Sequence, residues 1–187
     1  MYEGEPGDRV MILLAGRVKV TCLTDNGCET LVGVSDPGDF LGELSYVGCD
    51  ARLATVVALE PVEVLTIPST AFRAYVGRRP LVALALIELL AQRLRATTTR
   101  LARFSRSDTM GRLAALLTEL IDRYGRECER GVEISLTLSQ DELSAWTGAS
   151  RAGVTKALQT LRELGWIETG RRRIVVRNLE ALRARAA

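Results

Sequence analysis

The chain is 187 residues long, 47% apolar and 26% charged, and its formal net charge is +2. This composition is typical of a globular protein with a sizeable core, and the length allows one domain or two small ones. There is no apolar run long enough to span a bilayer and no basic-then-apolar leader, so we expect a cytoplasmic protein without membrane contact.

Histidine is absent, and the four cysteines (Cys22, Cys28, Cys49 and Cys128) have no metal-ligand spacing, so we expect no metal site. The lack of histidine also removes the commonest general base. No nucleophile–base pair is recognisable, which argues against an enzyme. Cys22 and Cys28 flank a predicted hairpin turn and could form a disulfide, but free thiols are expected in the cytoplasm.

Residues 1–67 are predicted to be all β. Short β-branched runs are separated by turn signals and lie at 10–14, 18–23, 30–34, 55–59 and 62–67. Many short strands joined by glycine-containing turns indicate a sandwich or jelly roll. The segment after Met1 reads as if it begins partway into the first sheet, so we expect a roll without its leading strand and with an open edge.

The segment from Asp39 to Arg52 holds an unusual cluster of residues. Gly42 permits close backbone approach, and a helical turn beginning at Gly42 and Glu43 would point free N–H groups at an anion. Arg52 is a residue type that binds phosphate through two parallel hydrogen bonds, and Glu43 can accept from a sugar hydroxyl. The cluster suits a phosphorylated ribose. A Glu43–Arg52 salt bridge at a β-turn is the alternative.

Two helices are predicted next. Ser69 is expected to cap a short helix through Val76, and Pro80 opens a long one that ends near Phe104. The long helix has an apolar seam with alternating spacings of four and three: Ala83, Ile87, Leu90, Leu94, Thr97, Leu101 and Phe104. This a/d heptad pattern predicts a two-stranded coiled coil and hence a homodimer.

Packing of the long helix against the chain's own β-domain is the alternative, and both contacts can hold on different faces. Thr97 interrupts the apolar seam, and Thr98 follows it. The hydroxyl of Thr97 is either a tolerated polar group or a ligand contact.

Residues 105–108 are predicted to form a hinge, and Asp108 to cap a helix that ends at Tyr124. After it, the chain has the layout of a winged helix-turn-helix. Ser139 with Glu142 forms a capping box, and Gly148 supplies the backbone freedom for a sharp turn.

The second helix of this pair is capped by Ser150 and has an inner and an outer face. The apolar residues expected to face the core are Val154, Ala157, Leu158, Leu161 and Leu164. The residues expected to meet DNA are Ser139 and Ser150 at the helix starts, the outward Arg151, Ala152, Thr155, Lys156 and Gln159, and the wing residues Arg171, Arg172 and Arg173. An ordinary αα-hairpin with a basic surface loop is the alternative.

Charge is distributed unevenly along the chain. Residues 1–75 carry a net charge of −6, whereas residues 76–138 and 139–187 carry +4 each. A basic C-terminal half suits phosphates, and an acidic N-terminal half would be repelled by them. The asymmetry therefore favours double-stranded DNA as the partner of the C-terminal half.

From residue 2 to about residue 177 the chain resembles the Crp/Fnr family of bacterial transcription regulators. These combine a cyclic-nucleotide-binding β-roll, a dimerising helix and a winged helix-turn-helix. Gly42-Glu43-Leu44 with Arg52 matches the family's phosphate-binding cassette. The resemblance implies that the first three residues line the phosphate and ribose, that Arg52 pairs with the cyclic phosphate, and that RNA polymerase is a partner.

The same resemblance assigns roles on the long helix. Arg93, Thr97 and Thr98 fall where cyclic-AMP-binding members carry an arginine and two hydroxyl residues. This implies that the two threonines contact the nucleotide base, one from each subunit.

The chain departs from the family pattern at both sites. Leu53 follows the cassette arginine, where cyclic-AMP binders usually carry Ser or Thr, so a hydroxyl to the phosphate is lost. A lost hydrogen bond to a charged group costs about 1.5–3 kcal/mol, or roughly ten- to a hundredfold in affinity. On the recognition helix Ala152 replaces a glutamate and Lys156 an arginine, so a different operator is expected.

The sequence therefore predicts an α+β protein in three parts. These are a jelly-roll-like cyclic-nucleotide-binding β-roll without its leading strands (1–78), a dimerisation helix with a hinge (79–107) and a winged helix-turn-helix (108–187). We expect a homodimeric, sequence-specific DNA-binding regulator controlled by cAMP or another cyclic nucleotide. Two alternatives are an effector-independent family member with a degenerate pocket, and a cyclic-nucleotide-sensing module that acts on a protein partner.

Overall fold

The computed structural model describes residues 1–24, 27, 29–44, 51–104, 108–136, 138–171 and 173–186. The chain divides into two compact units, Met1–Ala96 and Thr97–Ala187. None of the described helices is both long and apolar enough to cross a membrane.

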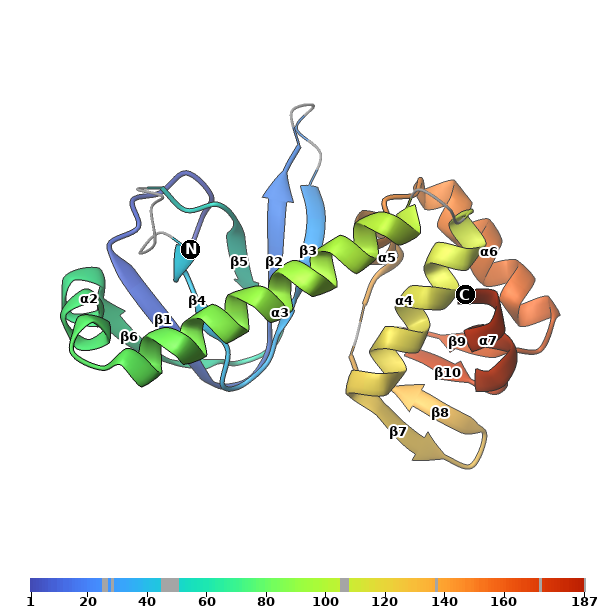
Figure 1. Cartoon of the computed structure of the whole chain (residues 1–187). Helices are drawn as coiled ribbons and strands as arrows, with labels where there is room; N and C mark the ends of the chain where they lie inside the picture. The colour runs from blue at the N-terminus through green and yellow to red at the C-terminus, as the bar shows by residue number, and fades with distance from the viewer. Residues whose placement is uncertain are drawn as a thin grey trace. The chain divides into compact units, whose positions relative to one another are not determined.

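The N-terminal unit is a roll of two small antiparallel sheets, with strand orders β4-β1-β6 and β3-β2-β5 (Figure 1). The strands are β1 (Arg9–Ala15), β2 (Val18–Leu23), β3 (Glu29–Ser35), β4 (Phe40–Leu41), β5 (Thr55–Ala58) and β6 (Glu63–Pro68). The five predicted strands are confirmed to within one residue at either end. The two-residue β4 was not predicted, because two residues show no alternation.

The interior of the roll is formed by alternate residues of its strands. Leu13, Val18 and Leu41 make one buried cluster. A second cluster joins Val10 of β1 to helix residues Phe72 and Leu86. The roll is therefore closed on one side by helices.

The helices that follow are α2 (Ser69–Gly77) and α3 (Pro80–Phe104). The bounds of α3 are those predicted. The predicted cap at Ser69 is wrong: Pro68 is the N-cap residue, and the Ser69 hydroxyl donates to the Gly7 carbonyl at 2.8 Å. The hydroxyl thus ties α2 to the start of the roll.

The apolar seam predicted on α3 is divided between two faces. Ala83 and Leu90 pack, partly buried, against the roll cluster that contains Leu86. Ile87, Leu94 and Leu101 are 60%, 68% and 66% exposed. Packing on the chain's own β-domain therefore uses one face of the helix, and a second apolar stripe remains at the surface.

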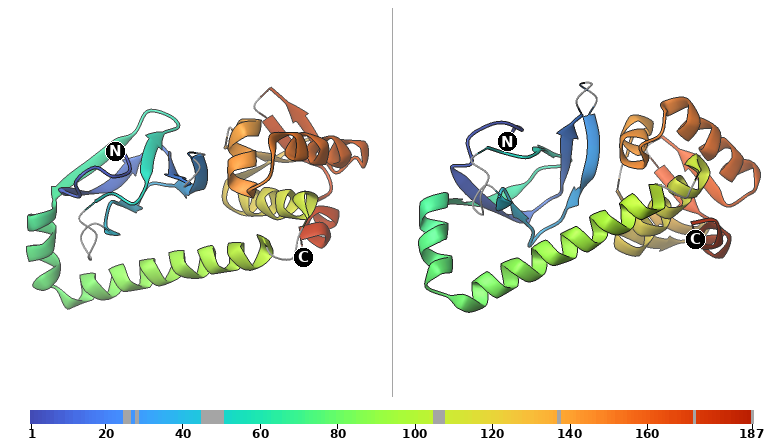
Figure 2. Two further views of the ribbon diagram at one scale, coloured as in Figure 1. Left: turned by 90° about the horizontal axis from the view of Figure 1, so that it is seen from above. Right: turned by 45° about the horizontal axis from the view of Figure 1, so that its top comes forward.

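The C-terminal unit combines a four-stranded antiparallel sheet, order β7-β8-β10-β9, with four helices (Figures 1 and 2). The strands are β7 (Gly125–Cys128), β8 (Gly131–Ile134), β9 (Ile167–Gly170) and β10 (Arg173–Val176). The helices are α4 (Thr109–Tyr124), α5 (Gln140–Thr147), α6 (Arg151–Glu163) and α7 (Leu179–Ala186). The β7–β8 hairpin and α7 were not predicted.

Helix α4 is the centre of this unit, with Leu113 and Leu117 fully buried. The Asp108 cap is confirmed, since its carboxylate accepts from the Gly111 N–H at 2.8 Å. The same carboxylate is bound through both oxygens by Arg185 of α7, at 2.5 and 2.6 Å. The predicted hinge residues 105–107 lie outside the described part of the chain.

The described cysteines, Cys22 and Cys128, are free thiols. Cys28, the predicted alternative partner of Cys22, and Cys49 lie outside the described residues. Among the described residues, no three His, Cys, Asp or Glu side chains gather where they could hold a metal ion.

Candidate effector pocket and nucleic-acid interface

Arg52 lies inside the roll, directly against Gly42. It is 5% exposed and donates to the Gly42 carbonyl at 3.2 Å and to the Arg9 carbonyl at 2.6 Å. Gly42 has φ +78°, and a Cβ on it would overlap the Arg52 guanidinium. Glycine is therefore required here for two reasons. The positive φ disfavours any other residue, and a side chain would collide with the Arg52 guanidinium.

Asp8 is the acidic neighbour of this arginine. Its carboxylate lies 3.6 Å from Arg52 and is also bound by Arg9 at 2.7 Å. The hydrogen bond from the Arg9 side chain, followed by the positive charges of Arg9 and Arg52, lowers the pKa of Asp8. Most of the hydrogen bonding of Arg52 is to carbonyl dipoles, so much of its charge remains available to an anion.

Glu43 is 2% exposed and pairs with Arg93 of α3 at 2.5 Å. Arg93 also donates to the Phe40 carbonyl at 2.8 Å. The alternative of a Glu43–Arg52 salt bridge is thus wrong, because the carboxylate turns toward α3. The pair joins the cassette to α3 within the N-terminal unit.

A cavity of about 90 Å³ lies between these groups. Its lining includes Gly42, Glu43, Leu44, Arg52, Leu53, Arg93 and the buried Ser35. The Leu53 side chain is 51% exposed and has no hydroxyl to offer. Thr97 and Thr98 lie in the next turn of α3 and are exposed. A helical turn was predicted to begin at Gly42 and Glu43; residues 45–50, on which its course depends, lie outside the described part of the chain.

The α5–turn–α6 segment has the predicted local chemistry. The Ser139 hydroxyl accepts from the Glu142 N–H at 3.2 Å, and the Glu142 carboxylate accepts from the Ser139 N–H at 2.9 Å. Gly148 is left-handed with φ 59°. Ser150 caps α6 by accepting from the Gly153 N–H at 3.1 Å. These contacts confirm the capping box, the turn glycine and the second cap.

Helix α6 presents its predicted outer face to solvent, since Arg151, Ala152, Thr155, Lys156 and Gln159 are all exposed. Four of the five residues expected in the core are buried, with Val154 and Leu161 fully so. The fifth, Leu164, is 50% exposed, and that prediction is wrong. It is the C-cap residue, where the helix ends and its periodicity no longer applies.

The wing is the β9–β10 hairpin. Arg171 is exposed at its turn, and Arg172 lies outside the described residues. Arg173 is bound to Glu133 of β8 at 2.7 Å, and its guanidinium lowers the pKa of that carboxyl. The ion pair uses one terminal nitrogen of Arg173 and partly offsets its charge toward a phosphate.

Comparisons with known proteins agree with this architecture. Residues 1–79 match the cyclic nucleotide-binding domain, and residues 111–185 match the Crp-like helix-turn-helix domain. The chain is 33% identical to a CRP-like cAMP-activated global transcriptional regulator of Mycobacterium tuberculosis, over 98% of this chain and 82% of the relative. The chain belongs to the Crp/Fnr family of transcription regulators.

Two further likenesses support the family. The cyclic AMP receptor protein of Thermus thermophilus is 30% identical over 97% of this chain and 81% of its own length. A solved CRP/FNR-family regulator from the same organism covers all of this chain and 92% of its own, with a TM-score of 0.83 and 28% identity. This Crp/Fnr protein is a DNA-binding regulator rather than an enzyme, and it carries a cyclic nucleotide-binding domain.

Sequence reasoning missed several residues of the two sites. Asp8 and Arg9 contact Arg52 from 43 or 44 positions away, and the buried Ser35 lines the cavity. In the C-terminal unit, Asp141 lies 3.3 Å from Arg151, and Gln140 lies 3.1 Å from Thr155. The polar residues Gln140 and Asp141 in the first turn of α5 could have predicted these contacts, because the start of α5 lies close to the start of α6.

Proposed function

We propose that this Crp/Fnr protein is a cytoplasmic homodimer that binds cAMP in its β-roll and a specific operator through its winged helix-turn-helix. The observation that carries the proposal is the pair of buried charged side chains, Glu43 and Arg52, beside one cavity. Buried charges are rare unless they are paired or functional. An acid and an arginine together suit a ribose hydroxyl and a cyclic phosphate.

Binding and allostery use both the roll and α3. Arg52 pairs with the phosphate, Gly42, Glu43 and Leu44 hold phosphate and ribose, and Leu53 closes the pocket without a hydroxyl. Arg93, a residue of α3, connects the pocket to this helix through its ion pair with Glu43. Thr97 and Thr98 contact the base, one from each subunit. The effector thereby shifts the population of paired helices, and residues 105–108 transmit the shift.

On DNA, Arg151 reads a guanine, and Ala152 lies against a thymine methyl or makes no base contact. Thr155, Lys156 and Gln159, with Ser139 and Ser150 at the helix starts, add base or phosphate contacts. The wing residues Arg171, Arg172 and Arg173 bind phosphates. RNA polymerase is the protein partner through which the regulator acts.

Calorimetric titration of the purified protein with cAMP tests the sensing role. Saturable binding at micromolar affinity or tighter is expected. An absence of heat from folded protein would contradict the choice of effector. A mobility shift with duplex DNA that weakens as the salt concentration rises is the separate test of the C-terminal half, and the absence of any shift would contradict DNA binding.

A second candidate is an effector-independent regulator with a degenerate pocket. The cavity of about 90 Å³ is smaller than the 300–1,000 Å³ common for small-molecule sites, and Glu43 is already paired. In that case DNA affinity would be unchanged by cAMP.

A further inference from the structure

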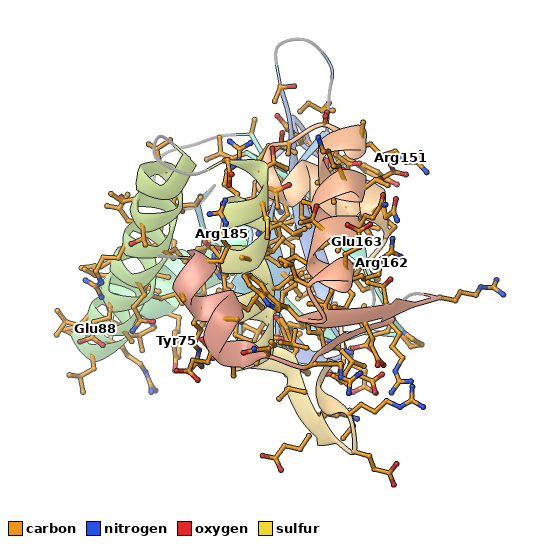
Figure 3. All side chains as sticks on the ribbon, turned by 90° about the vertical axis from the view of Figure 1, so that its right-hand side faces the viewer. Tyr75, Glu88, Arg151, Arg162, Glu163 and Arg185 are labelled. Atoms are coloured by element: carbon orange, nitrogen blue, oxygen red, sulfur yellow. The ribbon has the colours of Figure 1, made fainter. Side chains whose placement is uncertain are left out.

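The first turn of α5 contacts the outer face of α6 at two places. The Nε atom of Arg151 lies 3.3 Å from Oδ1 of Asp141, and the Thr155 hydroxyl lies 3.1 Å from Oε1 of Gln140. Figure 3 shows Arg151 at the end of α6 opposite Arg162 and Glu163, with its side chain pointing away from the body of the unit. Two consecutive residues of α5 thus contact two outward residues that lie one turn apart on α6.

The atom through which Asp141 holds Arg151 matters. A guanidinium has five N–H donors in a rigid fork. Guanine is read by two of them, one bonded to O6 and one to N7. An ion pair at Nε leaves both terminal nitrogens of Arg151 free to make that contact. The Asp141 carboxylate can therefore stay in place while the base is read.

Asp141 is itself well placed to act as a fixed support. It lies in the first turn of α5, where the Ser139–Glu142 capping box closes the helix start. An acidic side chain at a helix N-terminus is also stabilised by the helix dipole. Its side chain is 68% exposed, and that of Arg151 is 69% exposed. The pair therefore lies at the surface that the two helices offer to DNA, and not in the core.

The charge of Asp141 is unfavourable for simple phosphate binding, because a carboxylate beside the DNA backbone repels it. Asp141 can still favour specific binding if the gain from orienting the Arg151 side chain exceeds the cost of repelling the phosphates. We propose that Asp141 is a specificity-determining positioning residue, which orients Arg151 for a guanine. The inference rests on the proposed base reading by Arg151.

The two effects of Asp141 have opposite signs, which makes the test sharp. In Asp141→Ala the full chain should bind its specific duplex about five- to tenfold more weakly, as expected when part of one base contact is lost. Binding to a non-specific duplex should be unchanged or stronger, because a negative charge has been removed. Discrimination between the two duplexes should therefore fall.

The probes are a duplex selected by the wild-type chain from a randomised pool, the same duplex with its guanine pairs replaced, and an unrelated duplex. Affinities are measured with and without saturating cAMP. Glu129→Ala removes a negative charge from the exposed turn between β7 and β8 and is the matched control. Asp141→Glu should restore part of the discrimination, and the Arg151→Ala/Asp141→Ala double variant should discriminate no worse than Arg151→Ala.

The outcomes separate the two proposals. Loss of discrimination in Arg151→Ala but not in Asp141→Ala would overturn the positioning role and leave base reading intact. Equal weakening on all duplexes in Arg151→Ala would overturn base reading and the positioning role with it. Weakening on all duplexes in Asp141→Ala, together with a lowered melting temperature, would mean a structural role and would also overturn the inference.

Discussion

Arg52 and Arg93 both line the candidate effector pocket, and they are held by different kinds of partner. Arg93 is neutralised by a full carboxylate, Glu43. Arg52 is bound chiefly by two carbonyl oxygens, while the nearest carboxylate, Asp8, lies 3.6 Å away. Carbonyl dipoles orient an arginine without cancelling its charge. At the scale of single residues, these contacts support the proposal that Arg52 binds the anionic group of the effector and that Arg93 connects the pocket to α3.

Gly42→Ala tests the close packing of Arg52. The new Cβ would be strained by the positive φ, at about 1–2 kcal/mol, and would also displace the guanidinium. We expect a lower melting temperature and a weaker response to cAMP. Gly38 has φ +98° with nothing within 4 Å of the Cβ position, so Gly38→Ala carries the backbone strain alone. Equal effects of the two substitutions on cAMP binding would contradict the role given to Arg52.

At the scale of elements, α3 serves two surfaces. Its inner face packs on the roll through Leu86 and its partly buried neighbours. Its outer face carries Leu84, Ile87, Leu94 and Leu101, which are 55–68% exposed and spaced for a coiled-coil partner. A helix that packed only on the roll would carry apolar residues on its inner face alone, so the exposed apolar residues of the outer face indicate a second contact. The second set is the physical basis of the proposed dimer.

Leu94→Glu should convert the dimer to a monomer. Each leucine buried at an interface contributes about 1.5–3 kcal/mol, and twofold symmetry doubles the loss. The dissociation constant should therefore rise by about two to four orders of magnitude. Sedimentation equilibrium measures it. Leu81→Glu changes a leucine that is 80% exposed but outside the stripe, and it should leave the mass unchanged. A dimeric Leu94→Glu variant would disprove this interface.

Both ends of α4 are tied by charge to the last turn of α7. Arg185 binds Asp108 at the start of α4, and Arg183 binds Asp122 at 2.7 Å. The Gly111 N–H, with a further contribution from the Arg185 side chain, lowers the pKa of Asp108 below its ordinary 3.8. The folded protein therefore holds this proton less tightly than the unfolded chain does. The stabilisation is fully present above pH 3.8 and is lost as pH falls through the lower folded value.

Asp108→Asn should make this contribution visible. Asparagine caps helices about as well as aspartate, so the difference reports mainly the charge. Wild type should unfold at higher temperature near neutral pH, and the gap should close as the solution is acidified below about pH 4. Asp122→Asn removes the other carboxylate that is paired with α7 and serves as the control. A difference in unfolding temperature between wild type and Asp108→Asn that did not change with pH would contradict the charge contribution assigned to Asp108.

At the scale of the whole molecule, charge is segregated along the chain. The first 75 residues carry a net charge of −6 and the remainder +8. Arg171 is an exposed cation of the wing and serves to bind phosphate in the proposed complex. Arg171→Ala should weaken binding about equally on all duplexes and reduce the slope of log K against log salt by about one per subunit. A change in base preference would contradict a phosphate-only role.

The features that could be predicted from the sequence are those set by near neighbours. Asp108, Ser139 and Ser150 each cap a helix by accepting from a backbone N–H three residues on, and Gly148 has the left-handed conformation of the turn; these local roles are confirmed. The partners of Arg52 and Arg93 lie 10 to 53 positions away and depend on strand register and helix packing. The strands β7 and β8 have four residues each, and the apolar–polar alternation of β8 covers only Val132, Glu133 and Ile134, which is too short to be recognised as a strand.

The contact between Asp108 and Arg185 has a consequence for protein engineering. It brings together the first residue before α4 and the last turn of α7. A fold whose first and last segments touch tolerates circular permutation and insertion into a host loop. Residues 108–186 should therefore be transplantable as a cassette through a short linker across that contact, whereas a bulky fusion tag placed directly after α7 would press on the start of α4.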